Sequence, residues 1–175
     1  MRLVASYARK WVTEDATRPH ELPAGMQDFR IKWRNQSGEH TWSRIWNWRN
    51  APEGYVSWID PSPGVPMADN PLAEVGCPYT VRGFDYDYLG VLWLNDVVWR
   101  TDHWEVVPEN VCESGLNRHR QRTKREKDSN GPEHHALLRK LQQGYRILLS
   151  RALKGVYVWC EDDETRDHLQ SCLFE

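Results

Sequence analysis

The chain has 175 residues, of which 39% are hydrophobic and 27% charged, and its formal net charge is -2 at pH 7. This length suits one α/β domain that buries a core without disulfides or metals. The charge excludes a globally basic nucleic-acid-binding protein, so any such surface must be a local patch. Neither a signal peptide nor the roughly 18–20 apolar residues of a membrane helix can be found, so we expect a cytoplasmic protein without a membrane partner.

Cysteine and histidine residues favour no metal site. The four cysteines form no CxxC pair, and the adjacent His134 and His135 point in different directions on a helix. The unusual feature is the number of tryptophans, which is ten. Indole rings can stack nucleobases. With no periodic basic residues around them, we expect most of them to pack in the core.

The first third of the chain predicts few regular elements. Residues 2–8 form a short apolar run that predicts a buried strand, and such a strand at a free end suggests one lobe of something larger. Residues 13–40, interrupted by proline and glycine, predict a loop and a short hairpin. Residues 42–48 predict a short helix or turn. Residues 55–59 predict a strand, which the turn at residues 60–64 ends.

Strands and helices alternate in the second half. The apolar run at residues 89–94 is typical of a buried parallel strand. Residues 97–100 and 104–107 can pair as a hairpin, residues 156–160 predict another buried strand, and residues 163–172 predict a last helix. Short links between these elements indicate right-handed crossovers and a parallel sheet.

A helix with a core-facing stripe precedes the last strand. Apolar residues recur at spacings of three and four from Leu138 to Ala152. Gly144 lies inside this stripe and predicts a close approach between the helix and a strand. Gly155 is placed to cap the C-terminus of the helix.

Two segments contain residues suited to phosphate and sugar contacts. Thr80 to Asp87 (TVRGFDYD) combines Gly83, which lets backbone amides approach a phosphate, with carboxylates that can accept a ribose hydroxyl. Arg151, near the end of the apolar helix, can reach the developing charge on a phosphate as an arginine finger. Without further context, an ordinary polar turn and a solvated arginine explain the two segments better.

A basic run follows the predicted hairpin. Residues 116–127 carry six Arg or Lys residues against one Glu, and we expect residues 116–132 to be a mobile basic segment. Its cations can contact nucleic-acid phosphates. A solvated loop or helix face is an equally good interpretation. The nucleic-acid-binding candidates here are Arg118, Arg120, Arg122 and Lys124.

The order of these segments resembles a known family. TVRGFDYDYLGVLW followed by YRILLSRALKGVYVWC is similar to the Schlafen group 3-like DNA/RNA helicase domain, whose motifs have the forms TxQGxEFDYxGV and YRxLLTRGxKGxYVY. The opening RLVASYARKW resembles the start of that family's second RecA-like lobe, and residues 71–77 resemble the segment before its glycine motif. The resemblance implies that residues 1–175 form one C-terminal RecA-like lobe. This would be an α/β fold of the P-loop NTPase type, with a mainly parallel sheet flanked by helices and a Trp-rich irregular or hairpin insertion.

The resemblance also implies roles for individual residues. Thr80, Gly83 and Asp85 would contact nucleotide ribose and the nucleic-acid backbone, with Asp85 at the acidic ribose-binding position. Arg151 would contact the γ-phosphate as the catalytic arginine. Arg82 stands where the family usually has Gln, a residue that couples nucleotide to nucleic acid, and a cation there can still contact phosphate.

One part of an ATPase is missing from the sequence. No G-x-x-x-x-G-K-[ST] phosphate loop occurs, and no strand ends in paired acidic residues that hold Mg²⁺. The family places these parts in an N-terminal lobe, which would precede Met1. We therefore expect ATP and Mg²⁺ to bind only together with that lobe, DNA or RNA to be a second partner, and this chain alone to be inactive. The alternatives are a stand-alone nucleic-acid-binding or protein-interaction module and a decayed fragment.

Overall fold

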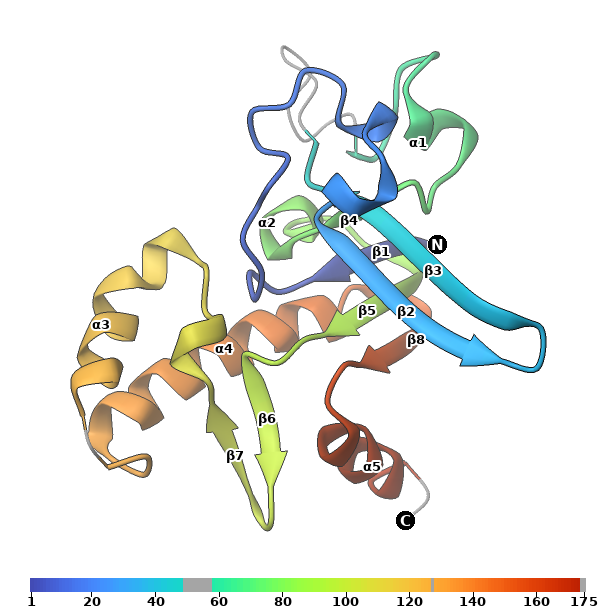
Figure 1. Ribbon diagram of the computed structural model, residues 1–175. Helices are drawn as coiled ribbons and strands as arrows, with labels where there is room; N and C mark the ends of the chain where they lie inside the picture. The colour runs from blue at the N-terminus through green and yellow to red at the C-terminus, as the bar shows by residue number, and fades with distance from the viewer. Residues whose placement is uncertain (49–57, 127, 174–175) are drawn as a thin grey trace.

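The computed structural model describes residues 1–48, 58–126 and 128–173. The strands are β1 (Arg2–Ala5), β2 (Phe29–Asn35), β3 (Gly38–Trp46), β4 (Glu74–Gly76), β5 (Tyr86–Trp93), β6 (Val97–Arg100), β7 (His103–Val106) and β8 (Ala152–Cys160) (Figure 1). The α-helices are α1 (Pro66–Asp69), α2 (Pro78–Val81), α3 (Asn117–Arg125), α4 (Pro132–Leu149) and α5 (Asp163–Ser171). In the described part of the chain, the second half has three strands, two helices, β8 and α5, which include the predicted strand, hairpin, long helix, strand and last helix in that order.

A six-stranded sheet in the order β2-β3-β4-β1-β5-β8 organises the molecule. Among the described residues, β1 pairs in parallel with β4 and β5, β3 with β4, and β5 with β8, while β2 pairs antiparallel with β3. The predicted α/β class is therefore confirmed. The sheet is mixed, because the β2–β3 hairpin adds an antiparallel edge strand, and a mainly parallel RecA-like fold is not confirmed.

Strand β1 is in the middle of this sheet. It pairs with β4 through Leu3 and Val4 and with β5 along its whole length. Val4 and Ala5 are fully buried. The apolar run at the start of the chain is therefore a central strand, which explains why it carries no charged residue after Arg2.

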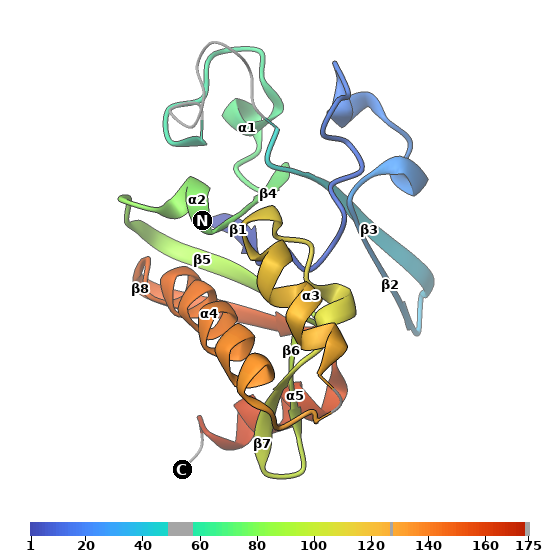
Figure 2. The same ribbon diagram turned by 90° about the vertical axis from the view of Figure 1, so that its left-hand side faces the viewer.

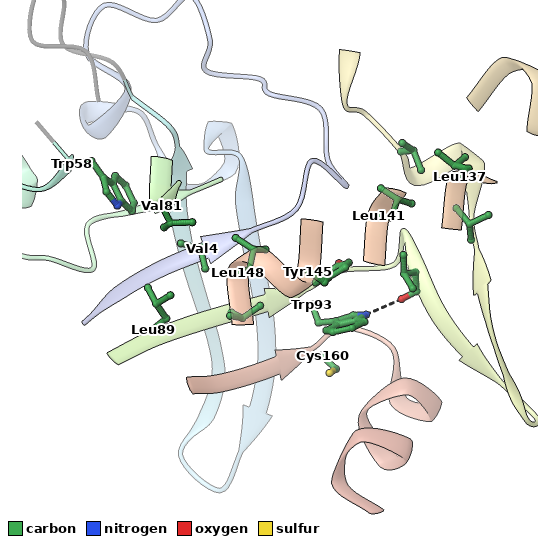
Figure 3. Close-up of a cluster of buried hydrophobic side chains, with 14 of the residues drawn as sticks. Val4, Trp58, Val81, Leu89, Trp93, Leu137, Leu141, Tyr145, Leu148 and Cys160 are labelled. Carbon is green, nitrogen blue, oxygen red and sulfur yellow. Dashed lines mark hydrogen bonds between the residues drawn. The ribbon is translucent and has the colours of Figure 1, made fainter. Parts of the chain in front are cut away.

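Helix α4 covers one face of the sheet, with α3 beside it (Figure 2). Its buried side chains recur at spacings of three and four, which is the periodicity of a helix with one face on a core. Figure 3 shows Tyr145 of α4 against Trp93 of β5, and the two rings stack with centroids 3.9 Å apart. The buried α4 residues are Leu137, Leu141, Tyr145 and Leu148.

Two glycines of this region have other roles than the sequence predicted. Helix α4 ends at Leu149, and Gly155 lies inside β8, so it does not cap the helix. Strand pairing with β5 extends β8 back to Ala152 and overrides the local glycine signal. A Cβ at Gly144 would meet no atom within 4 Å among the described residues, so Gly144 does not mark a close approach to a strand.

The predictions for the first third were partly wrong. Residues 19–21 and 24–26 form 3-10 turns, and a hairpin follows, as expected, but it extends through residues 42–46 as part of β3. The predicted helix or turn there is a strand because every residue of β2 pairs with one on β3. The strand predicted at residues 55–59 falls mostly outside the described residues, and Trp58 and Ile59 are not in a strand.

Tryptophans occur both in the core and on the surface. Trp46, Trp58 and Trp93 are buried, as expected for core packing. Trp33 is 46% exposed and Trp159 is 37% exposed, so packing does not explain every indole ring.

The basic run includes a helix. Residues 117–125 form α3, and Thr123 on this helix is fully buried. Mobility of residues 116–132 stays a prediction. Within the described residues, no helix is long and apolar enough to cross a bilayer, and no group of three or more His, Cys, Asp or Glu side chains is arranged to hold a metal ion.

Candidate nucleotide and nucleic-acid site

Asp85 and Arg151 lie next to each other at the amino ends of two neighbouring strands, although they are far apart in the sequence. Each precedes a strand, and β5 and β8 are parallel neighbours in which Tyr86 pairs with Ala152. The Arg151 guanidinium Nη1 lies 3.6 Å from the Asp85 carboxylate Oδ1. The backbone reinforces the pairing, because Tyr86 N–H donates a 2.8 Å hydrogen bond to the Arg151 carbonyl. Two predicted site residues are therefore brought together.

The two side chains of this pair remain accessible. The Asp85 side chain is 54% exposed and the Arg151 side chain is 34% exposed. The Nε atom of Arg151 is buried and has no hydrogen-bond partner among the described residues. An arginine held in this way keeps donors for a further anion.

Gly83 has a conformation that favours glycine. Its φ is +91°, and a Cβ there would meet nothing within 4 Å. The turn that it forms brings the chain from α2 to the start of β5, and Phe84 N–H donates to the Val81 carbonyl over 3.2 Å. The glycine is therefore required by its backbone geometry, whether or not it also contacts a phosphate.

The Thr80 side chain bonds to Cys77, and among the described residues it forms no hydrogen bond with Asp85 or Arg151. It is buried, and its hydroxyl accepts a 2.9 Å hydrogen bond from Cys77 N–H and donates a 2.7 Å bond to the Cys77 carbonyl. These bonds hold the first turn of α2. The predicted contact of Thr80 with a nucleotide or nucleic acid stays a prediction, and its hydroxyl is already engaged within the chain.

Arg82 is exposed and lines a pocket of about 490 Å³. The pocket lies between the end of β1, α2 and α4, and Lys140 and Gly144 of α4 also line it. Tyr7 and Tyr79, whose ring centroids are 6.0 Å apart, add aromatic surface. Its charged lining residues are Arg82, Lys140 and Glu113, and cations beside aromatic rings suit a nucleic-acid strand.

Most of the predicted cations on α3 have partners within the chain. Arg120 donates a 2.7 Å hydrogen bond to the Val111 carbonyl. Arg122 lies 3.8 Å from Glu133, and Lys124 lies 3.6 Å from Glu109. The fourth, Arg118, is exposed. The structure does not bring these four residues together with Asp85 and Arg151.

Sequence reasoning missed a polar set at the amino ends of three strands. Arg2 begins β1, Glu74 begins β4 and Tyr86 begins β5. Burial lowers the pKa of Arg2 and raises the pKa of Glu74, which lies 3.5 Å from His20. Burial also raises the pKa of Tyr86 to about 12. Local patterns did not reveal this set, because β4 was not predicted and the strand order that brings the three residues together is not contained in any one segment.

A second buried polar cluster lies beyond the other end of β5. The Asp96 carboxylate is fully buried and accepts hydrogen bonds from Tyr145 Oη at 2.6 Å and Ser6 Oγ at 2.9 Å. Burial raises the pKa of Asp96 to about 6, although both hydrogen bonds oppose this shift. The cluster ties β1, β5 and α4 together.

Comparison with known proteins gives one match. The model of the family described as Schlafen group 3, DNA/RNA helicase domain, matches residues 1–162. No curated protein and no solved structure matches the chain.

Proposed function

The chain belongs to the Schlafen group 3 DNA/RNA helicase domain family, and on this premise we propose that it is the C-terminal lobe of an ATP-dependent helicase. In this proposal an N-terminal P-loop lobe supplies the phosphate loop and the Mg²⁺ ligands that the sequence lacks. The nucleotide lies between the two lobes. The chain alone does not hydrolyse ATP.

The Asp85–Arg151 pair carries this proposal. The exposed Asp85 carboxylate can accept a hydrogen bond from a ribose hydroxyl, and the Arg151 guanidinium can contact the γ-phosphate. The guanidinium has five N–H donors, more than its pair with Asp85 uses, so it can also bind such an anion. The cation would stabilise charge that develops on the phosphate.

The pair must separate for both side chains to bind a nucleotide. Ion pairs between exposed groups contribute only about 0–1 kcal/mol. The 3.6 Å separation and the exposed carboxylate place this pair in that class. Its opening therefore costs little compared with the contacts that a bound nucleotide supplies.

Nucleic-acid binding by this chain alone is a second candidate function. Arg82 and Lys140, which line the pocket between α2 and α4, favour it together with the tyrosine rings beside them. Salt-sensitive binding to DNA or RNA without a second lobe would support it. The two functions are compatible, because the cations and the Asp85–Arg151 pair are different residues.

The test is an ATPase assay of the chain together with its P-loop lobe. An antibody against the chain first shows whether the native protein is larger than 20.7 kDa or whether the lobe is a separate protein that co-purifies. Arg151→Ala should then lower kcat by about 10³-fold or more, as the loss of an arginine finger does. Lys154→Ala is the matched control, since Lys154 forms an exposed pair with Asp87 at 3.2 Å on the neighbouring strand. Unchanged kcat in Arg151→Ala would overturn the assignment.

A further inference from the structure

The β2–β3 hairpin projects from the sheet (Figure 1). Strand β3 pairs with β4 only through Ile45 and Trp46, whereas β2 and β3 pair with each other from Phe29 to the turn at residues 35–38. Most of the hairpin therefore has no neighbouring strand besides its own partner. Ile31 and Trp42 on one face pack against the core, whereas Arg30, Lys32 and Arg34 on the other face are exposed.

Three cations share one face of this hairpin. Arg30, Lys32 and Arg34 alternate with Ile31 and Trp33 along β2, and alternate residues of a strand point to the same face. We call these three residues the cationic face. Their cross-strand partners are Ser43, Thr41 and Glu39, respectively.

The three residues of the cationic face form no ion pair within the described residues, and the one carboxylate opposite them is that of Glu39, across from Arg34. All three side chains are exposed. The cations of α3 differ, because Arg122 and Lys124 have carboxylate partners. Like charges in a row repel each other, and neither Arg30 nor Lys32 has an acidic cross-strand partner, so the stability of the hairpin does not explain these two cations.

We propose that the cationic face binds the phosphate backbone of a single nucleic-acid strand. The cations stand in single file, about 7 Å apart, because side chains on one face of a strand recur every two residues. A single file of charges matches one backbone rather than the two backbones of a duplex. The bound phosphates would release counterions, which makes the affinity depend on salt.

The aromatic residues of the hairpin are on its other face. Trp33 stacks on His40 with ring centroids 5.2 Å apart, and this pair lies opposite the cations. A strand that binds the cationic face leaves Trp33 free. The contact is therefore electrostatic, and it should tolerate substitutions that keep the charge.

This inference rests on the proposed function for its ligand class, but it concerns residues outside the Asp85–Arg151 pair. It can be tested without ATP or a second lobe. If the cationic face does not bind a strand, the ATPase result for Arg151→Ala is unaffected. If Arg151→Ala does not change ATPase activity, the result of the binding test is unaffected.

The experiment measures binding of the whole chain to a fluorescent oligo-dT strand by anisotropy over a range of NaCl concentrations. The triple variant Arg30→Gln, Lys32→Gln, Arg34→Gln should lower the slope of log affinity against log salt by about 2, at about 0.7 per phosphate contact. A variant with Arg30→Lys and Arg34→Lys should keep the slope. The matched control is Lys10→Gln, Arg139→Gln, Arg146→Gln, which removes three exposed cations elsewhere and should also keep it.

Four results would overturn the inference. The first is an unchanged slope in the hairpin triple variant, and the second is an equal loss in the control triple variant. The third is no binding of oligo-dT by the wild-type chain at low salt, which would leave an acidic protein surface as the occupant of this face. A duplex that binds more tightly than oligo-dT, and only through these cations, would refute the single-strand assignment.

Discussion

The hydroxyl of Tyr145 on α4 donates a 2.6 Å hydrogen bond to the fully buried carboxylate of Asp96, which follows β5. The same hydroxyl lies 3.0 Å from Ser6 Oγ and accepts a 3.2 Å bond from Leu94 N–H. One phenol oxygen thus joins the helix to two adjacent strands of the sheet. Removing it leaves the Leu94 N–H without this acceptor and takes one hydrogen bond from the buried Asp96 carboxylate, which keeps its bond from Ser6.

Tyr145→Phe should therefore destabilise the fold. Loss of a partner from buried polar groups costs about 1–3 kcal/mol, more where the group is charged. We expect a decrease of this size in the free energy of unfolding, measured by urea denaturation at pH 7. The control is Tyr157→Phe, whose side chain is 62% exposed and whose loss of a hydroxyl should change stability by less than about 0.5 kcal/mol. Equal effects in the two variants would contradict the role of the Tyr145 hydroxyl.

The raised pKa of Asp96 predicts an unusual pH dependence. Its pKa of about 6 in the folded state lies above the ordinary value of 3.8, so the folded state binds the proton more tightly. This contribution to stability is complete below about pH 4 and is lost as the pH rises through about 6. It corresponds to about 3 kcal/mol, at about 1.4 kcal/mol per pKa unit.

Asp96→Asn isolates this contribution, because the amide stays neutral at every pH. The free energy of unfolding of Asp96→Asn minus that of the wild type should increase by about 3 kcal/mol from pH 4 to pH 7. Urea denaturation of both proteins at four pH values measures this difference. A difference that does not vary with pH would show that Asp96 is not protonated near pH 6.

Gly144 offers a stabilising substitution. It lies inside α4, and a Cβ there would meet no described atom within 4 Å. Alanine in a helix interior is favoured over glycine by about 1 kcal/mol, so Gly144→Ala should raise the free energy of unfolding by about that amount. Gly76→Ala should do the opposite, since its Cβ would lie 2.6 Å from the Trp58 ring. Thermal denaturation of both variants checks the two signs, and a destabilised Gly144→Ala would mean that this position is crowded.

The sequence predicted the elements whose signals are local. The β6–β7 hairpin, α4 and α5 were found because alternation, spacings of three and four, and turn residues all occur within short stretches. The prediction of a helix or turn that includes residues 42–46 was wrong. Tryptophans at both ends of this segment obscured the alternation of a strand, and it is the pairing with β2 that makes the segment a strand. The cationic face of β2 follows the same alternation, with Arg30, Lys32 and Arg34 at every second position, and becomes recognisable once residues 29–35 are known to be a strand.

The candidate site depends on information that local patterns do not contain. Asp85 and Arg151 become neighbours only because β8 pairs with β5, and a pattern in one segment does not reveal strand order. The family resemblance supplied that link. For Thr80 the resemblance was less informative. Its position in the motif predicted a ligand contact, but it did not reveal that the hydroxyl is bonded to Cys77.

The contrast between two carboxylates tests whether the Asp85–Arg151 pair is structural. Asp162 accepts two hydrogen bonds from Arg100, at 2.9 and 2.8 Å, and caps α5 by accepting from Thr165 N–H. These bonds, the one from Arg100 above all, lower the pKa of Asp162. Asp162→Ala should cost about 1–2 kcal/mol, as the loss of an N-cap does.

Asp85→Ala should change the free energy of unfolding by less than about 0.5 kcal/mol, because its pair with Arg151 is an exposed one. Urea denaturation of the two variants at pH 7 gives both values under the same conditions. If Asp85→Ala costs as much as Asp162→Ala, the pair holds the fold together and is not free to open for a nucleotide. A small cost for Asp85→Ala, combined with loss of ATPase activity beside the P-loop lobe, separates binding from stability at this edge of the sheet.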